Sequence, residues 1–503
     1  MGIESPVWDY LILTASNERQ ASAYSSLLAR RRLDRVRRTM VVPDLEGKRI
    51  GSGGSTVVCL REVLATEQRA GESAAATLGR LRILIVHAGG DSRRLPAYGP
   101  CGKIFLPVPA GEGQTLFDLL VPEFLELPAG AGGQVVVTAG DALLKLDMSA
   151  VRFDRPGITG VGSWEEPADA ARHGVFVEGE PNAVRLYLQK PGVEEQQAAG
   201  AVRAGKTILD AGVLSFDGAA AAALVRAFPG TQTMLEKGVD IYREVCCALG
   251  SDATAEHFVK SAQGSGSAWT EGELRELFPA LSGIPFWIQV SPRCEFLHFG
   301  STRQLIESGR ALSGRSLMVM NSAVSAEIAG EESWVEGCRI GAPVKLGGRN
   351  VLVGVEVNEP LEMPAGACVD VLSGEGGWFI RCYGVDDDFK KPAAKGGRFC
   401  GRPMLEWIAA VGGSAEDFWS GAGERSLWNA RVFPVEARPE HAKYLWMFDV
   451  ERAGGGQKRA YLAAERRSAE EIALLSDQDA FHARRWVEPR TTMLGSTMSE
   501  RGR

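Results

Sequence analysis

Residues 83–107 read ILIVHAGGDSRRLPAYGPCGKIFLP, and this stretch decides the fold. Its first four residues are apolar and mostly β-branched, which predicts a buried strand. Gly89 and Gly90 follow the strand, and their lack of a Cβ lets the backbone approach a ligand closely. Three basic side chains come next: Arg93, Arg94 and Lys103. Backbone amides combined with fixed positive charge suit a polyphosphate, so we expect a triphosphate site at this strand end.

This loop differs from two common nucleotide-binding motifs. No Gly-Lys-Ser/Thr opens a following helix, as it does in a P-loop, and no G-x-G-x-x-G follows the strand, as in dinucleotide-binding proteins. The alternative is an ordinary glycine turn with surface arginines. The ordered succession of strand, glycines, arginines and lysine favours a binding loop. It is similar to the signature of sugar nucleotidyltransferases.

The composition of the whole chain is that of an ordinary globular protein. Of its 503 residues 45% are hydrophobic and 24% are charged, and its length suggests about three domains. A net charge of −7 offers no general attraction to nucleic acid or to an anionic membrane. Nine scattered cysteines without a C-x-x-C pair indicate free thiols. With no signal-like N-terminus and no apolar run of ~18 residues, we expect a cytoplasmic protein.

Further segments place polar groups near the glycine loop. Residues 8–15 read as a strand, and the Gly- and Ser-rich residues 51–56 read as a loop that opens a helix, a position that suits an anion. Residues 134–138 read as another strand, and Asp141 follows it. Alternating strands and helices predict a Rossmann-like α/β domain with a mostly parallel sheet, which binds ligands at the carboxyl ends of its strands. The glycine loop and Asp141 would share that edge.

The sequence changes in character at about residue 296. From there to residue 382, short β runs alternate with Gly and Asn turns in an imperfect six-residue rhythm. This rhythm predicts a β-helix-like domain, with a β-sandwich as the alternative. We therefore expect a catalytic domain at 1–295, a β-helix-like domain at 296–385 and a mixed α/β region at 386–503. The β-rich part is also the candidate surface for contacts in a homo-oligomer.

Several segments together resemble the GDP-fucose pyrophosphorylase family, whose module occurs alone or fused to L-fucokinase. They are HAGGDSRRLPAY (87–98) with Gly102-Lys103, WDY…TASN (8–17), GSGGST (51–56), DAGVLSFD (210–217), VDIY (239–242), FLHFGST (296–302), WVEGCRI (334–340) and SLWNARVFP (426–434). The resemblance implies that GTP and β-L-fucose 1-phosphate give GDP-L-fucose and pyrophosphate. The kinase half is absent from this sequence, so we expect no phosphorylation of free fucose.

The resemblance also implies roles for individual residues. Arg94 matches the family's catalytic arginine and would stabilise the α-phosphoryl group and the leaving pyrophosphate, while Arg93 would assist and Lys103 would hold the triphosphate. Asp141 matches the family's metal motif and would bind Mg²⁺, or Mn²⁺ in its place. The nucleotide-binding positions would be Gly53, Gly54, Ser55, Gly89 and Gly90.

Three residues are candidates for the sugar-phosphate side: Lys190, Asp210 and Asp240, and either Asp210 or Asp240 could instead complete the metal site. Asp210 could instead be a capping residue, and Lys190 a solvated loop lysine. His87 is expected to be a core histidine. The expected partners are GTP and a sugar 1-phosphate, and the identity of the sugar stays open.

One alternative of a different class remains. It is an inactive nucleotide-sensing, sugar-nucleotide-sensing or scaffolding protein on the same fold. The joint presence of Arg94, Lys103 and Asp141 favours the enzyme, because an inactive copy has no chemical need for all three.

Overall fold

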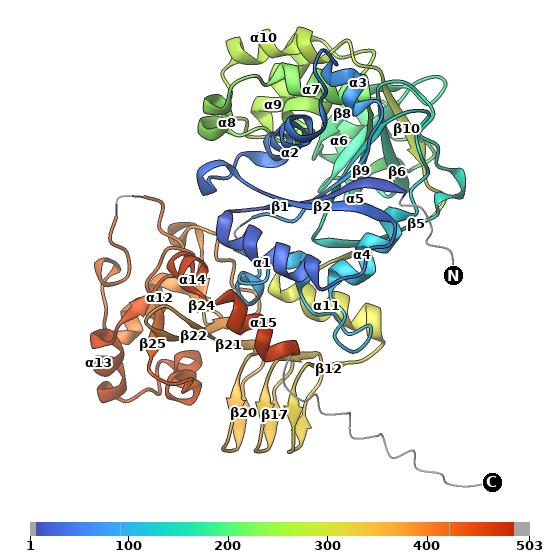
Figure 1. The fold of residues 1–503 in the computed structure, drawn as a ribbon. Helices are drawn as coiled ribbons and strands as arrows, with labels where there is room; N and C mark the ends of the chain where they lie inside the picture. Colours follow the sequence, from blue (N-terminus) through green and yellow to red (C-terminus); the bar gives the residue numbers. More distant parts are fainter. Residues whose placement is uncertain (1–6, 91, 422, 487–503) are drawn as a thin grey trace, which may run out of the picture. The chain divides into compact units, whose positions relative to one another are not determined.

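The computed structural model describes residues 7–90, 92–421 and 423–486. Contacts within the chain divide it into two compact units, whose elements are labelled in Figure 1. Unit 1 comprises Met1–Gly90 and Phe117–Phe296, and unit 2 comprises Asp91–Leu116 and Leu297–Arg503. Residues 91–116, which the sequence assigns to the first domain, therefore pack with unit 2. The division of the C-terminal part at 385/386 stays a prediction.

Unit 1 is built on a mixed β-sheet. Its strands are β1 (Trp8–Ala15), β2 (Val36–Pro43), β3 (Arg82–His87), β4 (Gln134–Ala139), β5 (Ala142–Leu146), β6 (Ile158–Glu165), β7 (Gly174–Glu178), β8 (Val184–Gln189), β9 (Thr207–Asp217) and β10 (Phe286–Val290). Its helices are α1 (Glu18–Ala29), α2 (Gly51–Glu67), α3 (Ala74–Leu78), α4 (Leu116–Leu125), α5 (Pro167–Ala170), α6 (Val193–Ala198), α7 (Gly218–Ala227), α8 (Thr231–Lys237), α9 (Ala255–Gly264) and α10 (Glu271–Leu281). The main sheet has the order β10-β6-β9-β4-β3-β1-β2.

Part of this sheet is parallel, as predicted. β2, β1, β3 and β4 all pair in parallel, with Leu13 opposite Val86 and Val86 opposite Thr138. β9 departs from the expectation, because it runs antiparallel to both β4 and β6. The sheet is therefore mixed rather than mostly parallel. The parallel part brings the ends of β1, β3 and β4 to one edge.

Both faces of this sheet are covered by helices. Side chains of alternate residues, such as Tyr10, Ile12 and Ile83, belong to one large core with residues of α2, α7, α9 and α10. Figure 1 shows α1 and α4 on the other face. Strands buried on both faces need apolar side chains at every position, which explains the continuous hydrophobic run at 83–86.

Unit 2 carries the strands that follow residue 316. They are β12 (Leu317–Met320), β13 (Ala323–Val324), β14 (Ile328–Ala329), β15 (Ser333–Glu336), β16 (Arg339–Ile340), β17 (Val344–Leu346), β18 (Val351–Val353), β19 (Glu356–Val357), β20 (Leu361–Met363), β21 (Ala367–Gly374), β22 (Gly377–Gly384), β23 (Arg398–Phe399), β24 (Arg402–Pro403), β25 (Phe433–Glu436) and β26 (Arg466–Arg467); β11 (Cys294–His298) precedes them. The helices are α11 (Thr302–Ser313), α12 (Met404–Val411), α13 (Gly455–Ala463), α14 (Ala469–Leu475) and α15 (Gln478–Trp486).

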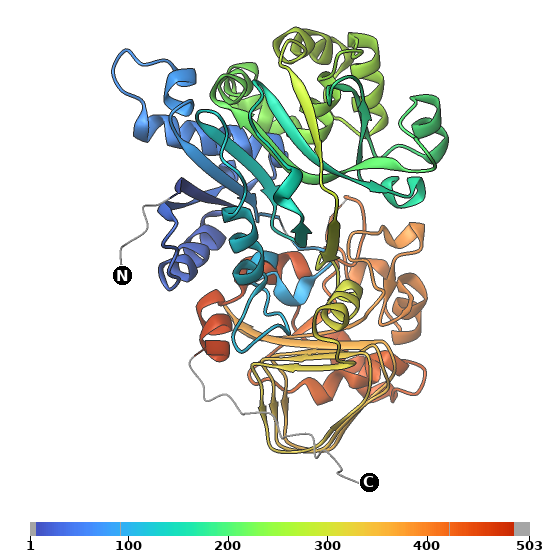
Figure 2. The same cartoon turned by 90° about the vertical axis from the view of Figure 1, so that its right-hand side faces the viewer.

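Short strands of unit 2 stack in three parallel series. These series are β12-β15-β18-β21, β13-β16-β19 and β14-β17-β20, and the coils they form are visible in Figure 2. Leu317 pairs with Ser333 and Trp334 with Val351, so equivalent positions recur after 16 or 17 residues. Antiparallel pairing begins only at β21 and β22. A sandwich of antiparallel sheets, the alternative, would not give this pattern.

The stacked short strands begin at Leu317, later than the predicted boundary at residue 296. Residues 302–313 form the helix α11 instead, because Ser301 caps its N-terminus and Leu305, Ile306 and Gly309 lie on one buried face. Within the described residues, no helix is long and apolar enough to cross a membrane.

Candidate active site

The carboxyl ends of β3 and β4 bring the glycine loop next to the segment of Asp141. The Gly140 amide, just before Asp141, donates to the His87 carbonyl at 2.9 Å. The Gly89 amide donates to the Thr14 hydroxyl at 3.2 Å, and a Cβ on Gly89 would lie 3.1 Å from the Ala15 carbonyl carbon. The close approach of the chain to β1 therefore favours glycine here. The predicted shared edge is a feature of the structure, while ligand binding by Gly89, Gly90 and Asp141 stays a prediction.

His87 ends β3 and is half-buried, so it is less enclosed than the core histidine that the sequence predicts. Its Nε2 lies 3.1 Å from the Thr56 hydroxyl. Burial lowers the pKa of His87 to about 4, so the imidazole is neutral at pH 7. A neutral histidine of this kind does not act as a general base near pH 7.

The Gly- and Ser-rich residues 51–56 form the first turns of α2, where the sequence predicts a loop. The amides of Gly53 and Gly54 both donate to the Val239 carbonyl, at 2.8 and 3.0 Å. This carbonyl satisfies donors that the first turn of a helix leaves unpaired. A Cβ on Gly53 would lie 2.7 Å from the Val239 side chain, so the packing gives its own reason for a glycine.

Ser55 is also engaged within the protein. Its hydroxyl donates to Asp44 Oδ1 at 2.6 Å, and burial raises the pKa of Asp44 to about 6. A nucleotide would have to compete with these internal partners for Gly53, Gly54 and Ser55. Their nucleotide-binding role stays a prediction.

Asp210 lies at an irregularity in β9. The pairing of β9 with β6 shifts register between Val161 and Gly162, and Gly212 has a φ of +75°. The shift re-aims side chains at the edge of the sheet, as β-bulges near binding sites commonly do. Asp210 Oδ1 accepts from the Gly212 amide at 2.7 Å, and Oδ2 accepts from the Tyr187 hydroxyl at 2.7 Å. Asp210 is thus held by its neighbours and does not cap a helix.

Asp240 is a capping residue, and its carboxylate is oriented by the chain. Its Oδ1 accepts from the amides of Tyr242 and Arg243 at 3.0 and 3.1 Å. Its own amide donates to Oε2 of Glu244 at 2.6 Å. Glu244 is fully buried and also accepts from the Ser267 hydroxyl at 2.6 Å. The buried Glu244 side chain therefore fixes the turn that carries Asp240.

Three predicted carboxylates influence the pKa of one phenol, that of Tyr242. Burial chiefly, and then the charges of Asp210, Asp240 and Asp141 among its neighbours, raise the pKa of Tyr242 well above its usual value. Tyr242 stacks on Tyr187, with ring centroids 6.4 Å apart and an angle of 13°. Both phenols stay protonated, and the Tyr187 hydroxyl donates to Asp210.

The acidic groups do not form a complete metal site made of protein alone. Within the described part of the chain, no three His, Cys, Asp or Glu side chains gather closely enough to enclose an ion. Mg²⁺ commonly keeps several waters and substrate phosphates and takes only one or two carboxylates. The oxygen donors of Asp141 and its neighbours fit that pattern.

Lys190 lies on a turn after β8. It follows β8 with a φ of +52°, and its amide donates to the His173 carbonyl at 3.0 Å. Its side chain is exposed, which agrees both with a contact to the sugar phosphate and with a solvated loop lysine.

The basic residues of the motif belong to unit 2. Arg94 has an exposed side chain, while its carbonyl accepts from the Thr302 amide at 2.9 Å. The Arg93 guanidinium lies over the Trp428 ring, 5.4 Å from its centroid. Lys103 is half-buried at the start of a short 3₁₀ turn, Lys103–Phe105. The structure thus fixes the backbone of this segment and leaves the Arg94 side chain at the surface.

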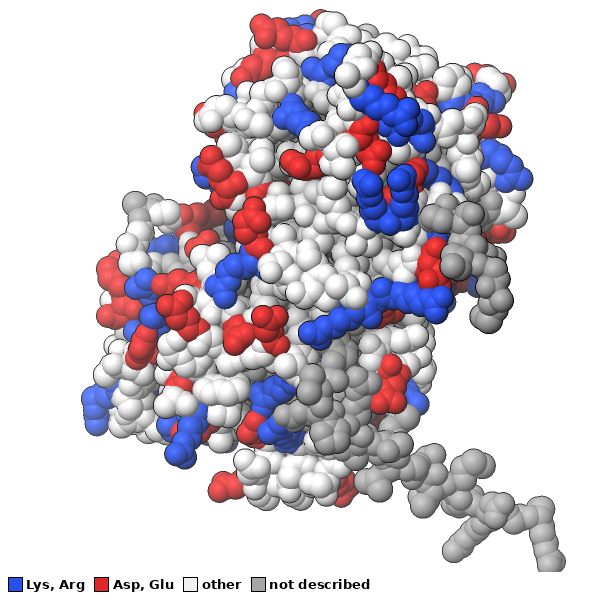
Figure 3. Space-filling model, in the orientation of Figure 1, with Lys and Arg blue, Asp and Glu red and all other residues white. Residues whose placement is uncertain are grey.

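A second group of arginines, at 30–38, has structural partners in unit 1. These residues follow α1 and run into β2. Arg31 pairs with Asp118 at 2.8 Å and Arg38 with Glu67 at 2.9 Å. On the face shown in Figure 3, basic and acidic side chains are interspersed. Salt bridges within the protein therefore account for these arginines without a phosphate ligand.

Three residues of this region were missed by sequence reasoning: Tyr187, Tyr242 and Glu244. Buried tyrosines in or after strands read as core, and a lone glutamate gives no pattern. Only Tyr242 carried a signal, since it closes the VDIY segment at 239–242.

Comparison with known proteins identifies relatives. The sequence pattern of the fucose pyrophosphorylase domain matches residues 75–438. The L-fucokinase/L-fucose-1-P guanylyltransferase of Bacteroides fragilis is 27% identical over 489 residues, which cover 90% of this chain and 49% of that protein. The bifunctional fucokinase/GDP-fucose pyrophosphorylase of Arabidopsis thaliana is 27% identical, covering 93% of this chain and 51% of that protein. This chain spans about half the length of these two relatives.

A shorter relative is covered more fully. The fucose-1-phosphate guanylyltransferase of Homo sapiens is 26% identical over 510 residues, which cover 85% of this chain and 81% of that protein. Among solved structures, HddC from Yersinia pseudotuberculosis aligns with a TM-score of 0.29 at 9% identity, covering 60% of this chain and 78% of HddC. A TM-score this low supports no argument about function.

Proposed function

This chain belongs to the fucose pyrophosphorylase family, and we propose that it transfers a guanylyl group from GTP to fucose 1-phosphate. The products would be GDP-fucose and pyrophosphate. The observation that carries the proposal is the family match over residues 75–438, within which Asp141, Asp210 and Asp240 all contribute to the raised pKa of Tyr242. No observation favours the inactive alternative, so we do not propose it.

The reaction needs placement and charge neutralisation more than acid–base catalysis. The sugar phosphate oxygen that attacks the α-phosphorus is already an anion at pH 7, so no general base is required. The neutral state of His87 agrees with this. Two highly charged substrates must instead be held in line while their repulsion is offset.

We assign that neutralisation to the basic segment. The exposed guanidinium of Arg94 would stabilise the charge on the α-phosphoryl group and on the leaving pyrophosphate. Lys103 would hold the triphosphate, and Arg93 would assist from its position over Trp428. We assign binding of the nucleotide phosphates to the amides of Gly89 and Gly90.

We assign metal binding to Asp141. Mg²⁺, or Mn²⁺, would neutralise phosphate charge, with waters and phosphate oxygens completing its coordination. Asp141→Asn should then lower kcat at least ten-fold, with partial recovery at higher metal concentration or with Mn²⁺. Equal activity of both proteins across a Mg²⁺ titration would remove Asp141 from this role.

The sugar side is assigned to Asp210 and Asp240. Their carboxylates are held by Tyr187 and by backbone amides, so they can accept hydrogen bonds from sugar hydroxyls without reorganising. Lys190 is proposed as a partner of the sugar phosphate. We also propose that the stacked coils of residues 317–363 make the 296–385 region β-helix-like.

The proposal is tested by pyrophosphate release. The purified protein is incubated with Mg²⁺, each of the four NTPs and a panel of sugar 1-phosphates. We expect release to be fastest with GTP and fucose 1-phosphate, and no fucose phosphate to form from free fucose and ATP. If no pair yields a nucleotide sugar, the proposal is wrong.

A further inference from the structure

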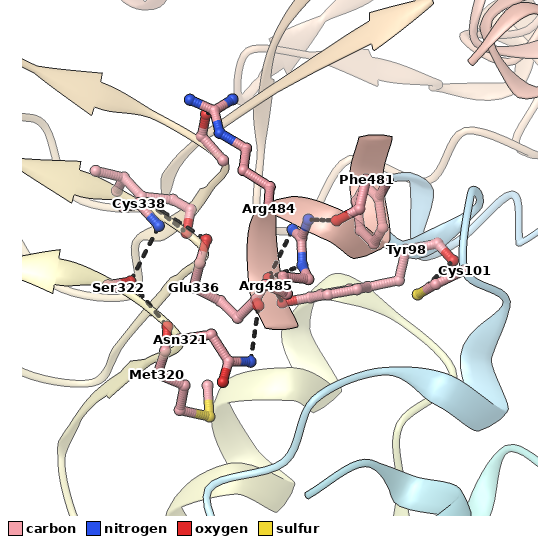
Figure 4. Close-up of polar contacts among 12 residues, drawn as sticks. Tyr98, Cys101, Met320, Asn321, Ser322, Glu336, Cys338, Phe481, Arg484 and Arg485 are labelled. Carbon is pink, nitrogen blue, oxygen red and sulfur yellow. Dashed lines mark hydrogen bonds and ion pairs between the residues drawn. The ribbon is translucent and has the colours of Figure 1, made fainter. Parts of the chain in front are cut away.

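A buried polar cluster in unit 2 surrounds the carboxylate of Glu336 (Figure 4). Glu336 ends β15 and its side chain is fully buried. Its Oε2 accepts from Arg485 Nε at 3.0 Å and Nη2 at 2.8 Å, and from the Tyr98 hydroxyl at 3.3 Å. Its Oε1 accepts from Asn321 Nδ2 at 3.1 Å. The Tyr98 oxygen in turn accepts from Trp334 Nε1 at 2.7 Å.

This cluster is costly to bury, and its donors and acceptors are well matched. The Arg485 side chain is only 2% exposed, so both charges of the pair have left water. A buried ion pair often adds little net stability over well-packed apolar groups, and its best-attested use is to fix one geometry. Burial also raises the pKa of Tyr98, which keeps its hydroxyl a neutral donor to Glu336.

The cluster fixes the geometry of the segment that carries Arg94 and Tyr98. Tyr98 is four residues after Arg94 and ends the 3₁₀ turn Pro96–Tyr98. Its ring packs edge-on against Trp334 and Phe481, each with centroids 6.4 Å away. Phe481 and Arg485 both lie on α15, so the C-terminal helix holds this turn through a ring and an ion pair.

Two further anchors act on the same short segment. The Arg94 carbonyl accepts from the Thr302 amide at 2.9 Å. The Pro96 carbonyl accepts from Arg381 Nη2 at 2.8 Å, and Arg381 is itself paired with buried Asp370 at 2.6 Å. Three separate parts of unit 2 therefore hold the backbone on which Arg94 stands.

We propose that Glu336 and Arg485 are positioning residues for Arg94, acting through Tyr98. The proposal rests on the proposed function for the role of Arg94, but the anchoring itself can be measured without any activity. Pre-organised charge is effective only where it is held in place, and a misplacement of about 1 Å can cost about 10²-fold in rate. Loosening the cluster should thus lower turnover although none of its members contacts the substrates.

The kinetic test compares neighbouring arginines on α15. Arg485→Gln removes the charge that pairs with Glu336, and Tyr98→Phe removes only the hydroxyl. Arg484→Gln is the matched control, because Arg484 pairs with Glu356 and donates to the Gly354 carbonyl instead. We expect kcat to fall about ten-fold or more in Arg485→Gln, which is about 1.4 kcal/mol of barrier.

The other variants separate positioning from general packing. Tyr98→Phe should lower kcat in the same direction, and Arg485→Lys should recover part of the loss. KM for GTP and for fucose 1-phosphate should stay within about three-fold in all of these proteins. Arg484→Gln should keep kcat within about two-fold. A loss in Arg484→Gln equal to that in Arg485→Gln would overturn the proposal.

Hydrogen exchange tests the anchoring directly. Amides of residues 93–105 should exchange about ten-fold faster in Arg485→Gln and in Tyr98→Phe, but not in Arg484→Gln. If Arg485→Gln does not fold, Tyr98→Phe still decides the outcome. Unchanged exchange in a folded Tyr98→Phe protein would overturn the proposal. An inactive wild type with faster exchange in these variants would contradict the proposed function alone and would support the anchoring.

Discussion

The two units hold the halves of one motif in different ways. In unit 1, Gly89 lies two residues after β3, which pairs in parallel with β1, and its amide donates to the Thr14 hydroxyl on β1. In unit 2, the segment around Arg94 is fixed by side chains from distant elements, among them Arg381, which donates to the Pro96 carbonyl, and Trp334, which donates to the Tyr98 hydroxyl. The division falls between residues 90 and 91. Contiguity in sequence therefore does not make this motif one packing unit, and its basic half depends on the C-terminal part of the chain.

The largest expected effect comes from removing the support of unit 2. A chain ending at Val385 lacks β25, which pairs with β22, and lacks α15, which pairs with Glu336. Leaving a buried charge unpaired costs about 3–5 kcal/mol, in addition to the apolar surface exposed. We expect the truncated chain to aggregate, as measured by size-exclusion chromatography. A monodisperse truncated chain with wild-type kcat would show that the comparison is wrong.

The next largest effect is expected on kcat when a single basic residue of the motif, Arg94, is replaced. Arg94→Ala should lower kcat about 10²-fold or more, if its guanidinium contributes ~3 kcal/mol of charge stabilisation. The side chain is exposed, so the melting temperature should hardly change. Steady-state kinetics and a thermal melt are measured on the same sample. Near-normal turnover in a folded Arg94→Ala protein would remove this residue from the chemistry.

A smaller effect compares one buried carboxyl in each unit. Burial raises the pKa of both Asp210 and Asp387 to about 6, from an ordinary value near 4. The folded state therefore binds the proton more tightly than the unfolded state. Each group's contribution to stability, on the order of 3 kcal/mol per group, is full below about pH 4 and is lost as the pH rises through about 6.

Asparagine at either position removes that titration. Between pH 4 and pH 7, the free energy of unfolding should fall less in Asp210→Asn and in Asp387→Asn than in wild type. Only Asp210→Asn should also lower kcat, because Asp387 accepts from the Gly384 and Gly401 amides within unit 2. Urea melts at four pH values measure the first effect. A loss of kcat in folded Asp387→Asn as large as in Asp210→Asn would break the distinction between the units.

The smallest effect is expected on the stacked coils themselves. Lys345 pairs with Glu362 and Arg349 with Asp386, and all four side chains are exposed. Exposed pairs of this kind contribute about 0–1 kcal/mol. Replacement of Lys345 or Arg349 by alanine should keep kcat within about two-fold. A ten-fold loss from either change in a folded protein would place the coils in the active site.

Local pattern was sufficient for much of unit 1. The apolar run at 83–86 and the strand at 8–15 are β3 and β1, because a strand buried on both faces needs uniform apolar side chains. The carboxyl ends of parallel strands lie at the same edge of a sheet, so the parallel pairing of β3 and β4 places Gly89 close to the segment that carries Asp141.

Other features depend on distant contacts that no local pattern contains. Gly53 reads equally as a ligand contact and as a close approach to Val239. Tyr187 reads as core until Asp210 is seen beside it. The packing of residues 91–116 with unit 2 depends on partners such as Trp334 and Arg485, more than two hundred residues away in sequence. These are the points at which the sequence-based prediction of the fold and the site was incomplete.

The proposed reaction is tested most directly by its stoichiometry. Phosphorus NMR follows GTP, fucose 1-phosphate and Mg²⁺ with the wild-type protein, which resolves the diphosphate of a nucleotide sugar from free pyrophosphate. We expect GDP-fucose and pyrophosphate to appear in equal amounts as both substrates disappear, and Arg94→Ala to slow the formation of both products equally. Consumption of GTP to GDP and inorganic phosphate, or no consumption of fucose 1-phosphate, would contradict the proposed reaction.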